Sequence, residues 1–346
     1  MPKTIRIYFL HKTIVTLEET VKYLNLDAQK YNFIWDTENP DYLFVSEHIY
    51  LKKRIYKKFL SLIKTGTISI YCAGECIEPD LNLFDYAIVF DRNLRSGDRI
   101  ARIPAMHFHK ASVLENKNTI HTIEEARKEL KTKKEFCNFL YSNGRAHPIR
   151  DQLFYAISAY KNVDSLGGHL RNVDNIAGKL GGYDWAAGGI SIKKHYRFSI
   201  ASENATYEGY VTEKLLTSFQ AHTVPIYWGD PGVKKEFNEK AFIYVNELSS
   251  LDEVVEKIKQ VEENEELWCS MIAEPWQTEE QVERQEKEMA EYQLFLANIF
   301  DQDKEKAIRR AQGTYPEEYR KWFRQRFFMS LDEFVYRVGR KLQKHS

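Results

Sequence analysis

The sequence lacks an excess of either charge: its 346 residues include 50 Lys and Arg and 50 Asp and Glu, so the formal net charge is zero. A protein that binds nucleic acid needs a basic field over much of its surface, so we expect no nucleic-acid partner. No stretch approaches the roughly 20 apolar residues that a membrane-spanning helix needs. The N-terminus, MPKTIRIYFLHK, has neither the apolar run nor the cleavage site of a signal peptide. These absences predict a cytoplasmic protein.

Cysteine is scarce as well. The chain has four, Cys72, Cys76, Cys137 and Cys269. The first two form a C-x3-C, which is wider than the spacing of common zinc and redox motifs, and no second pair accompanies them. We therefore expect four free, mostly buried thiols in a reducing compartment.

Familiar metal and nucleotide motifs are also missing. The sequence has no G-x-x-x-x-G-K-[ST], G-x-S-x-G or H-E-x-x-H. His107 and His109 form an H-x-H, but no carboxylate or cysteine cluster supports them. The D-x-D at Asp301–Asp303 ends a charged helical segment, whereas a manganese site of that kind follows a strand. We predict that the protein requires no metal and no cofactor.

What the sequence does contain is an alternation of short apolar runs with helix-period segments. Expected strands are 5–10, 42–45, 68–71, 86–90, 136–141, 198–201, 224–228 and 241–245, and expected helices are 16–29, 51–64, 123–133, 150–160 and 211–220. This alternation predicts an α/β protein with parallel sheets covered by helices. We assign residues 1–130 and 131–300 to two Rossmann-like domains and residues 301–346 to a C-terminal tail.

Two segments allow two interpretations each. Seven of the 16 glycines lie between Gly167 and Gly189, which is typical of a surface loop or of a mobile lid over a ligand. Residues 315–346 are basic and rich in aromatic residues. Such a tail either contacts an anionic membrane surface or packs back across the first domain.

The densest group of candidate site residues lies in 196–233. A strand runs into Ser202-Glu203-Asn204, and GYVTEK (209–214) then opens a helix for which Thr212 is a candidate N-cap. A helix N-terminus with Lys214 in its first turn suits an anionic leaving group, and Glu213 can accept hydrogen bonds from ribose hydroxyls. The alternative is an exposed Glu–Lys pair without a ligand.

Two further candidates follow strands. Arg150 lies in SNGRAHPIR (142–150), where a guanidinium can bind phosphate oxygens in pairs or form an ordinary surface ion pair. Glu75 lies in YCAGECIEPD (71–80), where a carboxylate can act as a general base in a cleft or be an ordinary loop acid.

Taken together, these segments resemble the α1,3-fucosyltransferases, glycosyltransferase family 10 of the GT-B type. The resemblance spans roughly residues 71–245 and rests on three ordered matches: AGECIEPDLNLFDYAIVFD, YSNGRAHPIRDQLFYAIS and YEGYVTEKLLTSFQAHTVPIYWGDPGV. It implies a GT-B fold with an acceptor-side first domain and a GDP-fucose-binding second domain. It departs at Cys76, where the family usually has Asn, at Ile200–Ser202, and in the insert GGYDWAAGG (181–189).

The resemblance also implies residue roles. Glu75 matches the proposed general base, Arg150 and Lys214 would hold the donor diphosphate, and Asn204, Tyr210 and Glu213 would contact the nucleotide, ribose or fucose. Glu203 shares the E-N signature with Asn204, and Arg171 matches a G-x-x-R-N element near the donor region. A glycan on the sequon Asn204-Ala205-Thr206 would block the donor site, which again favours a cytosolic enzyme.

The implied reaction is inverting transfer of fucose from GDP-β-L-fucose to the GlcNAc of N-acetyllactosamine, which gives a Lewis x-type product. An α1,4 or dual linkage, a GT-B enzyme with another nucleotide sugar, and a non-catalytic glycan-binding module stay open as alternatives. The presence of Glu75, Arg150, Glu213 and Lys214 together favours an enzyme over a binding module. If the tail contacts a membrane, we expect the protein to lie peripherally on the inner face of that membrane.

Overall fold

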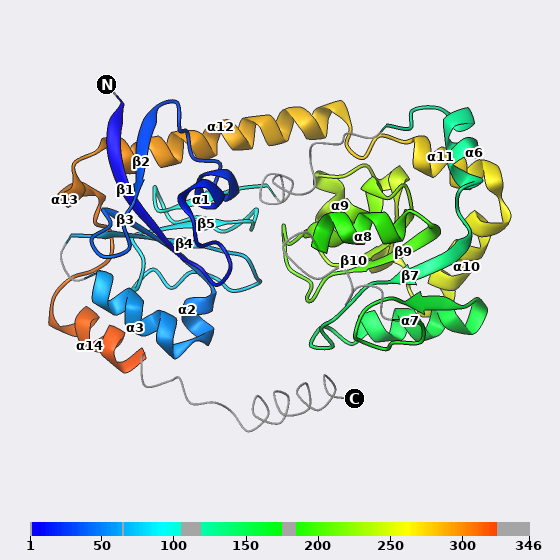
Figure 1. The fold of residues 1–346 in the computed structure, drawn as a ribbon, viewed down its shortest axis with the longest axis horizontal. Coiled ribbons are helices and arrows are strands. Elements are labelled where there is room, and N and C mark those ends of the chain that lie inside the picture. Colours follow the sequence, from blue (N-terminus) through cyan, green and yellow to red (C-terminus); the bar gives the residue numbers. More distant parts are fainter. Residues whose placement is uncertain (1, 64–65, 105–118, 175–184, 324–346) are drawn as a thin grey trace.

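The computed structural model describes residues 2–63, 66–104, 119–174 and 185–323. Within these ranges, two parallel sheets lie side by side, each covered by helices, and the long helix α12 runs from the second unit back to the first (Figure 1). This is the α/β architecture that the alternation of strands and helices predicts.

The first sheet has the strand order β2-β1-β3-β4-β5-β6, and every neighbouring pair is parallel. Its strands are β1 (Lys3–Leu10), β2 (Tyr31–Trp35), β3 (Tyr42–Ser46), β4 (Ile68–Cys72), β5 (Tyr86–Val89) and β6 (Ile100–Arg102). Strands β3, β4 and β5 are buried at every position because apolar residues follow one another without alternation. Such a sheet needs helices on both faces.

Two hydrophobic cores show how the faces of the first sheet are covered. One core includes residues of α1 (Leu17–Tyr23), α12 (Glu279–Asp301) and α13 (Lys304–Ala307). The other includes residues of α2 (His48–Leu51), α3 (Lys53–Leu62) and α14 (Thr314–Phe323). Helices therefore cover both faces of this sheet.

The second sheet has the order β11-β10-β9-β7-β8 and is also parallel. Its strands are β7 (Glu135–Phe139), β8 (Val163–Ser165), β9 (Tyr196–Ser202), β10 (Val224–Trp228) and β11 (Ile243–Tyr244). Its α-helices are α6 (Ile123–Leu130), α7 (Ile149–Tyr160), α8 (Trp185–Lys193), α9 (Glu213–Gln220), α10 (Leu251–Glu263) and α11 (Glu265–Ala273), and short 3₁₀ turns are η2 (Val233–Lys235), η3 (Glu239–Ala241) and η4 (Val245–Glu247).

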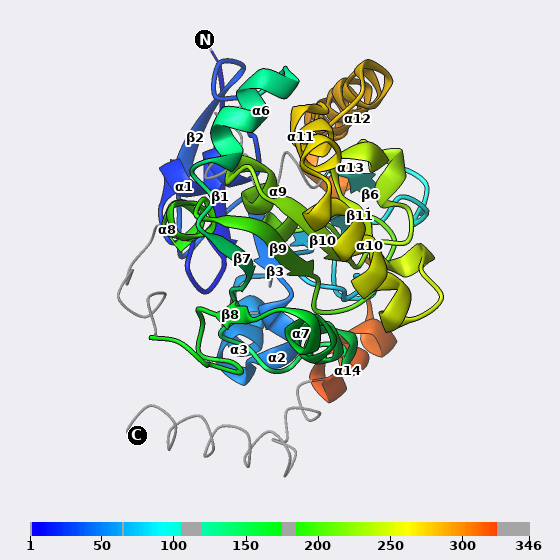
Figure 2. The ribbon, with the colours of Figure 1, turned by 90° about the vertical axis from the view of Figure 1, so that its right-hand side faces the viewer.

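Helices also cover both faces of this second sheet. The apolar residues of α7, α10 and α11 share one core, and those of α9 share another with Tyr227 and Phe237. Figure 2 looks onto this unit and shows α7 and α10 on one side of strands β7, β9 and β10, with α8 and α9 on the other. Each unit is thus a doubly wound α/β layer structure.

The packing divides the chain differently from the predicted boundaries. Helix α6 was expected in the first domain, but its Ala126 lies in a core of the second unit. Helix α12 was expected in the second domain, but its Leu296 and Phe300 are buried in a core of the first. The physical reason is the same in both cases, since an amphipathic helix shows in its sequence that one face is buried but not against which sheet.

Several element boundaries also differ from expectation. The helix expected over 16–29 ends at Tyr23, and the strand expected over 241–245 is reduced to β11. Strands β2, β6 and β8 were not predicted, and neither were helices α2, α8, α10, α11 and α13. Strand β2 lies at the sheet edge and alternates buried with exposed positions, so its apolar signal is weaker than that of the central strands.

The expectation for the cysteines is confirmed. All four cysteines are unpaired, and Cys72, Cys137 and Cys269 are buried. Among the residues that the structure covers, no helix has the length and apolar character to cross a membrane. The first part of the tail, α14, packs on the first unit, where the Tyr56 hydroxyl donates to the carbonyl of Arg320 (2.6 Å). The rest of the tail, residues 324–346, lies outside the described residues.

Candidate active site

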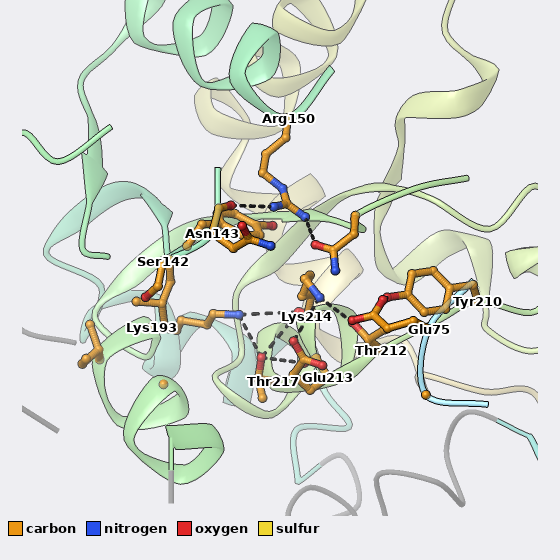
Figure 3. Close-up of a pocket in the computed structure, with 16 residues that line it drawn as sticks. Glu75, Ser142, Asn143, Arg150, Lys193, Tyr210, Thr212, Glu213, Lys214 and Thr217 are labelled. Atoms are coloured by element: carbon orange, nitrogen blue, oxygen red, sulfur yellow. Dashed lines mark hydrogen bonds and ion pairs between the residues drawn. The ribbon is translucent and has the colours of Figure 1, made fainter. Parts of the chain in front are cut away.

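A cavity of about 420 Å³ lies between the two units, at the carboxyl ends of their strands (Figure 3). The first unit contributes the turn after β4, and the second contributes the segment after β7, the end of β9, and helices α7, α8 and α9. The lining residues are Gly74, Glu75, Leu140, Tyr141, Ser142, Asn143, Arg150, Gly189, Ile192, Lys193, Asn204, Tyr210, Thr212, Glu213, Lys214 and Thr217. Ligands of open α/β sheets collect at this position.

The N-terminus of helix α9 forms one wall. Thr212 stands at the N-cap, but it does not cap the helix, because its hydroxyl donates to Glu203 Oε2 (2.7 Å) and its backbone N–H donates to Glu203 Oε1 (2.8 Å). The helix therefore presents the positive end of its dipole to the cavity without a capping side chain. An anion placed there gains both this partial charge and the charge of Lys214.

Lys214 is held by three oxygens. Its ammonium donates to Thr212 Oγ1 (2.9 Å) and pairs with Glu213 Oε1 (3.1 Å) and Glu203 Oε2 (3.3 Å). Burial opposes its charge, but the two carboxylates outweigh burial and raise the pKa of Lys214. Lys214 is therefore a permanently charged cation whose ammonium is oriented toward the cavity.

Glu203 lies behind the cavity rather than in its lining. Its side chain is fully buried, and burial raises the pKa of its carboxyl group against the opposing effect of Lys214. Because both its oxygens bind the start of α9, Glu203 connects the end of β9 to the helix N-terminus. The structure thus places this predicted donor-binding residue in a positioning role.

Arg150 is a buried cation with neutral partners. It is 1% exposed, and its guanidinium donates to the carbonyls of Ser202 (2.9 Å) and Asn143 (3.2 Å) and to Asn204 Oδ1 (2.7 Å). It also lies 4.2 Å from the centre of the Tyr141 ring. Among the described residues, no carboxylate lies within ion-pair distance of it, and its buried Nε has no hydrogen-bond partner. A ligand with negative charge would supply the missing counter-charge.

Glu75 faces these cations from the first unit. Its Oε2 accepts a hydrogen bond from the Tyr210 hydroxyl at 2.6 Å. Burial, followed by Glu203 and Glu75, raises the pKa of Tyr210 far above its ordinary value, so the phenol stays a donor. The preceding Gly74 N–H donates to the buried carboxylate of Glu47 (3.1 Å), which orients the turn. A half-buried carboxylate therefore stands opposite the cationic wall.

The structure brings together most of the predicted site residues. Six of them line the one cavity: Glu75, Arg150, Asn204, Tyr210, Glu213 and Lys214. Arg171 does not join them, since it is exposed in the loop after β8 and is not part of the lining. Within the G-x-x-R-N element, the next residue has a structural role instead. The Asn172 side chain binds the backbone of Val163 and Ser165.

The structure describes only some of the candidate metal ligands and loop residues. His107, His109 and positions 175–184 of the glycine-rich segment lie outside the described residues. Asp301 ends α12 and accepts bonds from Lys30 (2.8 Å) and the Tyr31 hydroxyl (3.0 Å). In the part of the chain that is described, no group of three or more His, Cys, Asp or Glu residues is arranged to hold a metal ion.

Sequence reasoning missed Lys193, which lies at the end of α8 and lines the cavity. It is 5% exposed, and its ammonium donates to Thr217 Oγ1 (2.8 Å) and Ser218 Oγ (3.2 Å). The sequence holds no signal for it, because Lys193 and Lys194 are adjacent and only the fold shows which one is buried.

The two facing α/β units and the cleft between them define the GT-B class of glycosyltransferases. Residues 130–312 match the family model of glycosyltransferase family 10 (fucosyltransferase), C-terminal part, and residues 12–109 match the N-terminal domain of α-(1,3)-fucosyltransferase FucT. The chain therefore belongs to glycosyltransferase family 10, the fucosyltransferases.

Individual relatives agree with this family. The chain is 31% identical over 232 residues to α-(1,3)-fucosyltransferase FucT of Helicobacter pylori, a match that covers 59% of this chain and 46% of that protein. It is 24% identical over 199 residues to human GDP-fucose protein O-fucosyltransferase 3, covering 56% and 40%. The chain thus matches less than half the length of these relatives.

Solved structures show the same fold. A crystal structure of an α1,3-fucosyltransferase with GDP superimposes with a TM-score of 0.66 at 24% identity, covering 87% of this chain and 92% of that one. One with GDP-fucose gives a TM-score of 0.62 at the same identity, covering 86% and 91%.

Proposed function

We propose that the protein is an inverting α1,3-fucosyltransferase that transfers L-fucose from GDP-β-L-fucose to the GlcNAc of an N-acetyllactosamine-type oligosaccharide. The observation that supports this most is the placement of Glu75 across one cavity from Arg150, Lys214 and the N-terminus of α9 in a family 10 chain. A base on one side and an anion-binding wall on the other are what a single displacement at a sugar phosphate requires.

In the proposed reaction, the Glu75 carboxylate takes the proton of the acceptor hydroxyl as that oxygen attacks C1 of fucose. The C1–O bond to the diphosphate breaks on the opposite face, so the β-linked donor yields an α-linked product. Negative charge grows on the leaving GDP, where Lys214, Arg150 and the α9 dipole stabilise it. Groups positioned before the reaction in this way each contribute several kcal/mol to such stabilisation.

The same groups support the proposal that no metal is required. Two buried cations and a helix N-terminus supply the positive charge at the diphosphate that a divalent ion supplies in other transferases. We further propose a cytoplasmic location, with any peripheral membrane contact made through residues 324–346.

The first experiment incubates the protein with GDP-fucose and N-acetyllactosamine in the presence of EDTA, and measures GDP release and product mass. We expect a product heavier by one deoxyhexose, with an α1,3 linkage by NMR. Glu75→Gln should lower turnover by about 10²–10⁴-fold, since it removes the general base. Glu78→Gln is the matched control, because this exposed carboxylate lies on the same turn but outside the cavity, and its turnover should stay within about twofold of the wild type.

Other results would redirect the proposal. An α1,4-linked product would change the linkage, and activity only with added metal would remove the metal-free mechanism. GDP-fucose binding without transfer would point to another acceptor, and a protein hydroxyl would be tested next because one relative is named a protein O-fucosyltransferase. Stabilisation by UDP or GDP-mannose, but not by GDP-fucose, would contradict the donor.

A further inference from the structure

Lys193 is a buried lysine that the proposed mechanism does not use. It lies in the last turn of α8, lines the donor side of the cavity, and has only neutral partners in the described residues: two hydroxyls and, at 3.5 Å, the Lys214 carbonyl. A charged lysine is rarely buried to this extent without a carboxylate partner, because the desolvation of the ammonium is then not compensated. The burial of the Lys193 ammonium therefore needs a physical explanation.

The position of its ammonium suggests one. Figure 3 shows the nitrogen atoms of Lys193, Lys214 and Arg150 around the same space, with Asn143 above and the start of α9 below. Lys214 is neutralised by Glu213 and Glu203, whereas Arg150 and Lys193 have no carboxylate within ion-pair distance in the described residues. With Lys193 charged, the wall would hold three cations against the two carboxylates Glu213 and Glu203. A neutral amine avoids this excess in the ligand-free protein, and a bound diphosphate would balance the third charge.

We propose that Lys193 is a third donor-site cation, which takes up one proton from solvent when the diphosphate of the nucleotide sugar binds. This inference rests on the proposed function. It concerns an equilibrium between the neutral amine in the ligand-free protein and the ammonium beside the anion. The proton comes from water or buffer, and no covalent bond to the ligand forms.

The electrostatic surroundings agree with this geometry. Burial lowers the pKa of Lys193 to about 7, although Glu213 raises it, and Lys214 lowers it further while Glu203 raises it. The titratable and charged groups around it are Glu213 and Lys214 of α9, Glu203 after β9, Tyr141 after β7, Arg150 of α7, the adjacent Lys194, and Lys133, which donates to the carbonyl of Lys194. An added diphosphate favours the charged amine and so raises its pKa.

The proposed proton uptake predicts that binding of the donor weakens as the pH rises. At pH 6 the free amine is already mostly protonated, so binding takes up only about 0.1 proton. At pH 8 it is mostly neutral, so binding takes up about 0.9 proton if the bound pKa returns above 9. The dissociation constant should accordingly rise about tenfold from pH 6 to pH 8.

The test is calorimetric titration with GDP-fucose at pH 6 and pH 8, in buffers of different ionisation enthalpy, which reports the protons taken up. GDP-fucose is the appropriate probe because its diphosphate has no group with a second ionisation near pH 6, unlike the terminal phosphate of GDP. Lys193→Met should abolish uptake at both pH values and weaken binding at pH 6 at least tenfold. Lys193→Arg should bind without uptake and without the pH dependence.

Lys194→Met is the matched control, since this neighbouring lysine is exposed, and it should behave like the wild type. Thermal unfolding of each variant shows that it is folded. Wild-type protein that binds GDP-fucose without proton uptake, or Lys193→Met that keeps the uptake, would overturn the inference alone. Wild-type protein that fails to bind GDP-fucose even at pH 6 would overturn the proposed function as well.

Discussion

At the residue scale, the shape of a cation decides what it can do in this cavity. The Arg150 guanidinium reaches three acceptors on two segments, one after β7 and one at the end of β9, while it lies over the Tyr141 ring. A lysine has the same charge, but its single nitrogen cannot reproduce this fork. Arg150 therefore both organises Asn204 and presents charge to a ligand, and the two functions cannot be separated by a substitution that conserves only charge.

We predict that Arg150→Lys weakens GDP binding at least tenfold and lowers the free energy of unfolding by about 1–3 kcal/mol, because buried carbonyls lose their donors. Arg171→Lys, at an exposed position outside the cavity, should change neither quantity measurably. Calorimetric titration with GDP and urea unfolding measure the two effects. Weaker GDP binding in Arg171→Lys would show that the loop after β8 does take part in donor binding.

At the element scale, helix α12 joins the two units by more than chain connectivity. It begins after α11 in the second unit and buries its C-terminal half against the first sheet, where the Tyr292 hydroxyl donates to the carbonyl of Leu24 (2.7 Å). Its end is held by Lys30, which pairs with Asp301. The helix therefore supplies part of the first unit's core from a distant part of the sequence.

Two leucines on this helix provide a matched test. Leu296 is 2% exposed and Leu294 is 70% exposed. Leu296→Ala should lower the free energy of unfolding by about 2–5 kcal/mol, because it leaves a cavity in the core of the first sheet. Leu294→Ala should change it by less than about 0.5 kcal/mol. Equal effects in urea unfolding would contradict the packing of α12.

At the scale of the whole molecule, a buried ion network connects the units. Arg92, which follows β5, donates to Asp230 Oδ1 (2.8 Å), Glu208 Oε2 (3.0 Å) and Glu236 Oε1 (2.9 Å) of the second unit. Asp230 also accepts the Gly209 N–H (3.0 Å). Gly209 has φ +80°, and a Cβ there would collide with the carbonyl of Phe90. The backbones of the two units thus approach closely next to Tyr210 and Glu75.

Arg92→Met should leave Asp230 buried without its partner and lower the free energy of unfolding by about 3–5 kcal/mol. Because the units are then less firmly joined, we expect scanning calorimetry to separate one transition into two. Arg95→Met, on the same loop but exposed, is the control. A single unshifted transition in Arg92→Met would show that the network does not couple the units.

Much of this site could be read from sequence because it is local. Glu213 and Lys214 are adjacent, they open a predicted helix, and their motif lies between two buried strands. Strand ends and helix starts are set by neighbouring residues, so a motif at such a junction predicts its own geometry. The motif alone grouped Glu203 with the donor-binding residues, because a motif does not tell which side chains face a cavity and which lie behind it.

The sequence by itself determined the α/β class, the family motifs and six cavity residues, because apolar periodicity and junction motifs depend on short-range chain geometry. Only the tertiary structure decided which sheet α6 and α12 cover, that Tyr210 binds Glu75 across the cleft, and that Lys193 rather than Lys194 is buried. The first two features are contacts between residues that are far apart in the chain, and the third distinguishes two adjacent residues of the same type. They depend on packing between elements, which the local pattern of one element does not encode.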